Sequence, residues 1–204
     1  MSEPAYPLTP RNRDGEQDWP AQGHWTYEDY LRLPDDGRRY EVIRGVLYVT
    51  AAPTYDHQYV VGQAFLNVGT FVVRRRLGVV LPAPFDILLP GIASPVEPDI
   101  VFFRSGNQPQ PGDKSFEGIP DLVIEVLSPK TRHIDLGAKL AAYQEAGIPE
   151  YWAIDPQLRT MVIYGLDRAS RKYIEWAQGG VGDRVISKAL PGFELVVEDL
   201  FPAR

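Results

Sequence analysis

The amino-acid sequence predicts an α/β protein, on three observations. A strand, a helix and a second strand follow one another between Ile119 and Asp155, in the order that packs a helix across its own sheet. A helical stripe of apolar residues runs from Tyr55 to Arg76. After Asp155, apolar and polar residues alternate in four segments that predict a C-terminal antiparallel meander: 160–164, 172–176, 184–187 and 193–197.

The segments before residue 119 supply the other expected elements. Residues 1–24 are rich in Pro, Gly and charge without periodicity, which predicts a flexible arm ahead of a single domain over residues 25–204. Thr26 is expected to cap a short helix that ends near Leu33. We expect two strands around Gly45, further strands over 78–81, 85–89 and 97–103, and a polar loop at 107–118.

The composition excludes several classes of protein. Cysteine is absent, which rules out disulfides, thiol catalysis and cysteine-based metal sites. No apolar run approaches the roughly 20 residues of a membrane span, and the N-terminus has no signal pattern, so we expect a soluble, cytoplasmic protein without membrane contact. The formal net charge of −6 argues against coating nucleic acid by bulk electrostatics, although it leaves local contacts open.

Two concentrated basic segments are candidates for such local contacts. The arginines at 74–76 end a predicted helix, where the helix dipole favours positive charge, and we interpret them as structural. Lys130, Arg132 and His133 follow directly after the strand expected over 122–127. We predict that these three residues contact nucleic acid.

The strand over residues 122–127 contains a carboxylate in an otherwise apolar run. Glu125 lies near its centre, between Ile124 and Val126. An ionised carboxylate in an apolar interior is costly unless a cation, a metal or hydrogen bonds compensate. Glu125 is therefore the strongest candidate for a functional residue.

The helix expected after that strand has one polar stripe. Asp135, Lys139 and Tyr143 recur every four residues, so they share a face that can turn towards the strand of Glu125. A structural alternative stays open, because an acid four residues before a lysine forms an ordinary helix salt bridge. The ring of Tyr143 is expected to pack rather than to bind.

Three acids, Glu41, Asp99 and Glu125, occupy strand positions far apart in the sequence. Two carboxylates at metal-ligand distance repel each other unless a hard cation lies between them, and Mg²⁺ or Mn²⁺ accepts a few such oxygens together with water. Such a site suits phosphodiester hydrolysis, because the metal polarises a phosphoryl oxygen and lowers the pKa of a bound water. Lys139 would orient that water and stabilise the charge of the transition state.

These acids also have structural interpretations. Glu41 can pair with one of the arginines at 38, 39 and 44, and Asp99 can be a turn acid after a proline. His57 and His133 are expected at the surface or as helix caps.

Several short motifs lie between about Tyr27 and about Tyr164. They are Tyr40-Glu41-Val-Ile-Arg-Gly45, the His57 region, Pro98-Asp99, Glu125 within DLVIEVLSPKT, and then Asp135, Lys139, Tyr143, Gly147 and Tyr151-Trp152. Together they resemble the putative restriction endonuclease family, a branch of the PD-(D/E)XK nuclease superfamily. Each motif alone would be weak, whereas the whole set is fairly specific.

The resemblance implies a restriction-endonuclease-like fold, with a mixed central β-sheet flanked by helices, and Mg²⁺-dependent cleavage of DNA by a homodimer. By that likeness Asp99 and Glu125 ligate the metal, Val126 offers its backbone carbonyl, and Glu41 is a further acid at the edge of the site. The sequence departs from the superfamily pattern at Leu127, where a lysine is expected.

Lys139, on the following helix, is the candidate for the missing amine. Asp99, Glu125 and Lys139 then form the expected catalytic set of an endodeoxyribonuclease. Two other functions stay open: a catalytically silent nuclease-like module that binds nucleic acid or protein, and a small-molecule phosphoesterase with similar metal chemistry. The presence of all three residues favours an enzyme, because a site that has lost its activity has no reason to retain buried charges.

Overall fold

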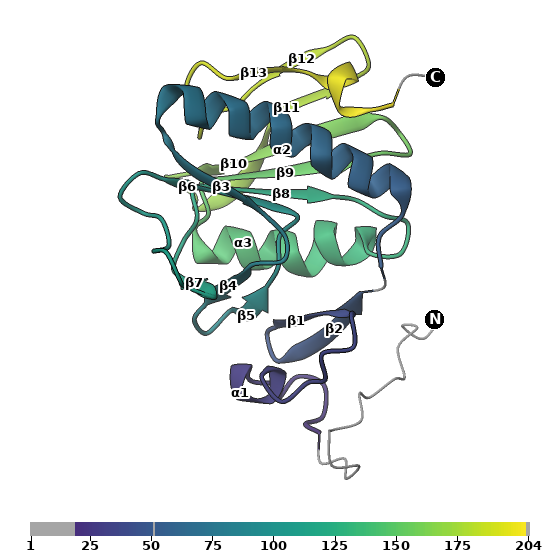
Figure 1. The fold of residues 1–204 in the computed structure, drawn as a ribbon, viewed down its shortest axis with the longest axis vertical. Helices are drawn as coiled ribbons and strands as arrows, with labels where there is room; N and C mark the ends of the chain where they lie inside the picture. The colour runs from purple at the N-terminus through teal and green to yellow at the C-terminus, as the bar shows by residue number, and fades with distance from the viewer. Residues whose placement is uncertain (1–18, 51, 203–204) are drawn as a thin grey trace.

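The computed structural model describes residues 19–50 and 52–202 (Figure 1), so most of the predicted arm lies outside the described residues. The segment from Trp19 to His24 packs against a β-hairpin: Trp19 stacks on Trp25 with ring centroids 5.3 Å apart, and Gln22 exchanges two hydrogen bonds with the backbone of Leu47. The short helix α1 (Tyr27–Tyr30) follows, and Thr26 and Asp29 form the capping box at its start.

The larger of two main sheets has six strands in the order β11-β10-β9-β8-β6-β3. All neighbours are antiparallel except β8 and β9, which the intervening helix joins as parallel strands. The bounds are β3 (Gly78–Pro82), β6 (Ile100–Arg104), β8 (Leu122–Val126), β9 (Glu150–Asp155), β10 (Thr160–Asp167) and β11 (Lys172–Gly180).

A second sheet has five strands in the order β2-β1-β5-β4-β7, and its one parallel pair is β4 with β7. The hairpin of β1 and β2 turns at Arg44 and Gly45, which both adopt positive φ. The bounds are β1 (Arg39–Ile43), β2 (Val46–Thr50), β4 (Asp86–Leu89), β5 (Ala93–Val96) and β7 (Ser115–Glu117).

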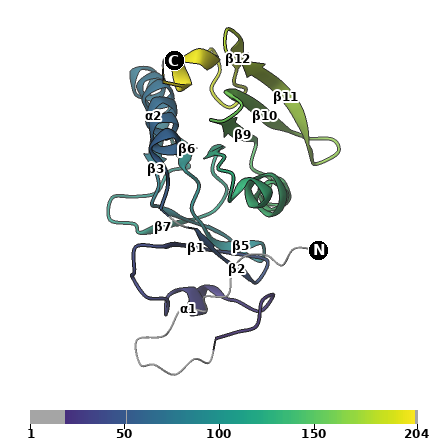
Figure 2. The same cartoon turned by 90° about the vertical axis from the view of Figure 1, so that its right-hand side faces the viewer.

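The helices cover opposite faces of the six-stranded sheet. The long helix α2 (Tyr55–Arg75) lies on one face, and α3 (Leu140–Ala146), preceded by the π-helical turn η1 (Ile134–Lys139), lies on the other, next to the five-stranded sheet (Figures 1 and 2). The C-terminal hairpin of β12 (Arg184–Ile186) and β13 (Glu194–Val196) and the 3₁₀ turn η2 (Val197–Leu200) complete the α2 side. None of the helices in the described residues has the length and apolar character to cross a membrane.

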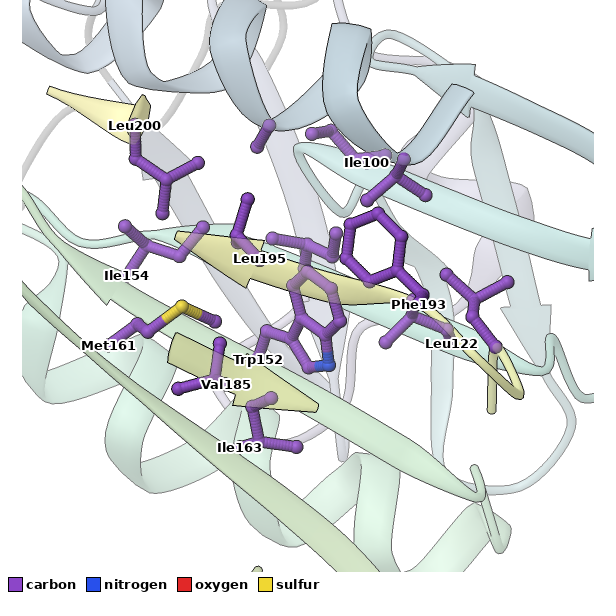
Figure 3. Close-up of a cluster of buried hydrophobic side chains, with 14 of the residues drawn as sticks. Ile100, Leu122, Trp152, Ile154, Met161, Ile163, Val185, Phe193, Leu195 and Leu200 are labelled. Carbon is purple, nitrogen blue, oxygen red and sulfur yellow. The ribbon is translucent and has the colours of Figure 1, made fainter. Parts of the chain in front are cut away.

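Two hydrophobic clusters follow from this layering. On the α2 side, Trp152 packs with residues of the sheet and the C-terminal hairpin, including Phe193 and Leu195 (Figure 3). Alternation along β8 sends Leu122, Ile124 and Val126 into this cluster, and Val123 and Leu127 into the cluster on the α3 side. The same alternation turns Glu125 towards α3 and the five-stranded sheet.

The fold is mixed α/β, as predicted, but its strands form two sheets rather than one central sheet. Pro82 and Pro84 lack the amide proton that a ladder needs; the chain leaves the six-stranded sheet after Pro82 and enters the five-stranded sheet at Asp86. The predicted C-terminal meander is also only partly correct. Its first two strands, β10 and β11, belong to the large sheet, where β10 pairs with β9 and β11 forms the edge. Within the described residues, β12 and β13 alone form a separate two-stranded sheet. Two short strands, β5 and β7, were not predicted.

Another buried carboxylate, Glu150 on β9, fixes the segment before β13. It is 1% exposed and accepts hydrogen bonds from the indole of Trp152 (2.7 Å), the hydroxyl of Ser187 (2.6 Å) and the amides of Lys188 (2.7 Å) and Ala189 (3.0 Å). Glu150→Gln places an NH₂ group against donors, so we expect it to lower the free energy of unfolding by about 1–3 kcal/mol. Urea denaturation measures the loss. The exposed Glu145→Gln is the control, and an equal loss in both variants would contradict this role.

Candidate active site

Five acidic and two basic side chains meet between the two sheets. They come from β1, from the segment between β5 and β6, from β8 and from η1. The acids are Glu41, Glu97, Asp99, Glu125 and Asp135, and the bases are Arg39 and Lys139. We call this set the acidic cluster.

Lys139 lies at the centre of the acidic cluster. Its ammonium nitrogen is 2.8 Å from Glu41 Oε1, 2.9 Å from Glu125 Oε1 and 3.7 Å from Asp135 Oδ1, and its side chain is 4% exposed. The phenol of Tyr143, one turn further along, donates to Glu125 Oε1 at 2.6 Å. The predicted stripe of Asp135, Lys139 and Tyr143 is therefore confirmed as one face, and it faces Glu125.

Asp99 stands next to Glu125 because of strand register. Ile100 pairs with Ile124 across β6 and β8, so one step further Asp99 lies opposite Glu125. The carboxylate of Asp99 accepts a hydrogen bond from the amide of Val126 at 2.8 Å, which turns this part of the β8 backbone towards it. The two carboxylates of the predicted metal site thus belong to neighbouring strands.

The other side of Asp99 contacts two basic side chains. Its Oδ2 is 3.3 Å from His57 Nε2, in the first turn of α2, and its Oδ1 accepts from Arg39 Nη1 at 3.1 Å. Arg39 Nε also lies 3.3 Å from Glu97 Oε2, and the amide of Glu97 donates to Glu41 at 2.8 Å. Residues from both sheets are therefore linked by ion pairs and hydrogen bonds at this point.

Burial and unlike charges determine the protonation of the acidic cluster. Burial raises the pKa of Glu125 to about 8, of Glu97 to about 7 and of Asp135 to about 6, against the opposing charge of Lys139 or Arg39. Burial would also raise the pKa of Asp99, but the hydrogen bond from His57 and the charges around Asp99 hold it well below its usual range. For Lys139, the surrounding carboxylates outweigh burial and hold its pKa well above the usual value.

The donor atoms fit a hard divalent cation of the Mg²⁺ type. When ionised, the five acids outnumber Arg39 and Lys139, so a further positive charge would be stabilised here. Within residues 19–50 and 52–202, no three Asp, Glu or His side chains are arranged to hold a metal. Mg²⁺ needs only one or two carboxylates with water, and Asp99 and Glu125 beside the Val126 backbone provide such a pair. Glu41 instead contacts Lys139, and its role as a ligand stays a prediction.

The predicted nucleic-acid contacts lie outside the acidic cluster, on the segment between β8 and η1. Lys130, Arg132 and His133 are exposed, and Arg132 forms an ion pair with Asp155. Arg132 and His133 line an open surface depression of about 430 Å³ together with Pro129, Leu136 and Gly137.

Sequence reasoning underestimated four residues of the site. His57 was expected at the surface or as a cap, but it contacts Asp99, and Tyr143 binds Glu125 instead of only packing its ring. Arg39 and Glu97 were not proposed as site residues. Both lie two positions from an acid that was proposed, and in extended chain such neighbours point to the same side, so that spacing could have revealed them.

A solved structure shows the same fold. A putative nuclease belonging to DUF820 from Anabaena variabilis superposes with a TM-score of 0.72 over 86% of this chain and 97% of that chain, at 20% sequence identity. At 20% sequence identity this similarity shows the fold alone. The protein is therefore of the mixed α/β class, with the same architecture as that structure.

The sequence also identifies the family. The model of the Uma2 family, described as putative restriction endonuclease, matches residues 27–198, and the chain belongs to that family. The resemblance drawn from the motifs is thereby confirmed. No curated protein matches the sequence.

Proposed function

We propose that this protein is a divalent-metal-dependent endonuclease that hydrolyses DNA phosphodiester bonds. The observation that carries the proposal is the convergence of Asp99, Glu125 and Lys139, from three separate elements, in one buried cluster. Family membership supports it, because the family is described as one of putative restriction endonucleases.

Asp99 and Glu125 would hold the metal, with the Val126 carbonyl as a third oxygen. Bound there, Mg²⁺ or Mn²⁺ would supply a polarised phosphoryl oxygen and a water of lowered pKa. Lys139 and Tyr143 both donate to Glu125 Oε1, so they fix the orientation of that carboxylate, and His57 and the Val126 amide fix Asp99 in the same way. Lys139 also adds positive charge at the site of the developing negative charge.

The proposal extends to partners. Lys130, Arg132 and His133 are exposed beside a surface depression, and we assign to them contacts with the DNA backbone. A homodimer would place two such sites on the two strands of a duplex.

A plasmid assay tests the nuclease proposal. Purified protein with supercoiled plasmid is expected to yield nicked and linear forms in Mg²⁺ or Mn²⁺ and none in chelator. Metal is also expected to raise the melting temperature, because a ligand at one hundred times its Kd stabilises the fold by about 2.7 kcal/mol. The same metal should leave Asp99→Asn unchanged in both measurements. Unaltered plasmid in every metal, together with an unshifted melting temperature, would reject the proposal.

One observation favours a second candidate, a small-molecule phosphoesterase. The side chains of Glu125 and Lys139 are 2% and 4% exposed, which restricts a large substrate more than a small one. Turnover of p-nitrophenyl phosphate or its bis-ester without DNA cleavage would support this candidate. DNA binding without turnover of either substrate would support a catalytically silent module.

A further inference from the structure

The acidic cluster is closed on most sides and reaches solvent along one edge. The side chains of Glu41, Asp99, Glu125, Asp135 and Lys139 are all between 2% and 6% exposed. Arg39 is 28% exposed, His57 13% and Glu97 10%. A ligand that approaches from solvent therefore meets Arg39, His57 and Glu97 first.

Of the two cluster cations, only Arg39 is placed to meet an incoming anion. Lys139 is enclosed by three carboxylates: its ammonium nitrogen lies at hydrogen-bond distance from Glu41 and Glu125, and 3.7 Å from Asp135. A guanidinium has five N–H donors in a planar fork, and the hydrogen bond that Arg39 makes among the described residues uses one of them, from Nη1 to Asp99. Its Nε also lies 3.3 Å from Glu97 Oε2, and the donors that remain can bind a second acceptor while the contacts with Asp99 and Glu97 are kept.

His57 adds a second polar atom at this edge. Its Nε2 contacts Asp99, whereas Nδ1 is enclosed and has no hydrogen-bond partner among the described residues. Buried polar atoms without a partner are rare in folded proteins, so an imidazole nitrogen of this kind beside a site is available to a ligand or a bound water. Glu97 opposes an anion, but its charge is compensated by its ion pair with Arg39.

We propose that Arg39 is the residue through which this site binds the phosphate of its substrate, with the imidazole of His57 beside it. This inference rests on the proposed function, because it assumes that the substrate carries a phosphodiester. The guanidinium would bind a phosphate oxygen from the solvent side, while its Nη1 stays hydrogen-bonded to Asp99. Arg39 is then a substrate-binding residue that belongs to the same strand as Glu41.

Arg38 offers a matched control for Arg39. It is the preceding residue, its side chain is 32% exposed, and it is ion-paired with Asp36 away from the acidic cluster. Arg38→Gln and Arg39→Gln remove the same charge from adjacent positions, so non-specific electrostatics change equally in both. Arg39→Lys keeps a positive charge beside Asp99 and Glu97 and removes the fork, so neither acid is left without a nearby cation.

Binding is measured in chelator, where no metal-dependent cleavage takes place, by fluorescence anisotropy with a fluorescein-labelled single-stranded oligonucleotide and its duplex. Arg39→Gln is expected to weaken binding about tenfold or more, and Arg38→Gln less than twofold. On the single strand, the slope of log K against log salt should fall by about 0.7 in Arg39→Gln only, as for one lost phosphate contact. Arg39→Lys should lie between Arg39→Gln and the unsubstituted protein.

Three results would overturn the inference: equal weakening by the Arg38 and Arg39 substitutions, unchanged binding by Arg39→Lys, or no binding of either oligonucleotide by the unsubstituted protein. If Arg39→Gln does not fold, Arg39→Lys decides. The outcomes are distinct from those of the nuclease proposal. If binding depends on Arg39 but no metal-dependent cleavage is found, only the nuclease proposal is rejected. If the protein cleaves DNA but binding does not depend on Arg39, only the inference about Arg39 is rejected.

Discussion

Glu125→Gln is expected to abolish metal-dependent cleavage while the protein stays folded. The amide retains the shape of the side chain and an oxygen that can accept from Lys139 and Tyr143. It removes the negative charge that would bind the metal, so we expect a fall in kcat of about 10²–10³-fold or more. Initial rates on supercoiled plasmid measure the fall, and thermal melting measures the fold.

Glu150→Gln is the matched control, because Glu150 is an equally buried acid on the neighbouring strand with a different set of partners. The Glu150→Gln variant should lose stability and keep its cleavage rate per folded molecule. Glu125→Gln should instead keep its fold and lose its cleavage rate. If instead Glu125→Gln unfolds and the surviving folded fraction cleaves normally, Glu125 is a structural residue and the proposed metal site is wrong.

Lys139→Met is expected to cause the largest loss of stability. It removes the ammonium that lies within 4 Å of Glu41, Glu125 and Asp135, and so leaves three buried carboxylates without their shared cation. Breaking a buried ion pair by removing one partner costs about 3–5 kcal/mol. Urea denaturation measures the change in the free energy of unfolding.

Two further variants sharpen that test. Lys130→Met makes the same chemical change at an exposed position nearby and should alter stability by about 0.5 kcal/mol or less. Adding Glu41→Gln to Lys139→Met should restore part of the lost stability, since it removes one of the uncompensated charges. Equal stability of Lys139→Met and Lys130→Met would show that the acidic cluster does not depend on its central cation.

The local elements, and the side chains that meet in the acidic cluster, were predicted from the sequence better than the arrangement of the sheets. Glu125 stood out because a carboxylate conflicts with an apolar strand, and the four-residue spacing of Asp135, Lys139 and Tyr143 placed them on one face. Both are local signals. The division into two sheets depends on which strands pair, and pairing between strands as distant as β1 and β5 leaves little trace in a single sequence.

The difference between local signals and long-range contacts also explains why some site residues were underestimated. His57 lies in the first turn of α2, where a capping role is the ordinary expectation, and its contact with Asp99 arises only when α2 packs beside the start of β6. Arg39 was considered as a partner for Glu41, yet it contacts Glu97 and Asp99, while Glu41 binds Lys139. Which charges pair with one another depends on tertiary packing, whereas spacing along the chain indicates only which side of a strand each charge lies on.

The acidic cluster also has a consequence for synthesis on the ribosome. Arg39 and Glu41 emerge well before Lys139 and Tyr143. Until Lys139 emerges, Glu41 and Glu125 lack the ammonium that lies between them in the folded protein. A chain released before Lys139 is made therefore lacks the central cation of the acidic cluster, so unfinished copies would not have the nuclease activity proposed above.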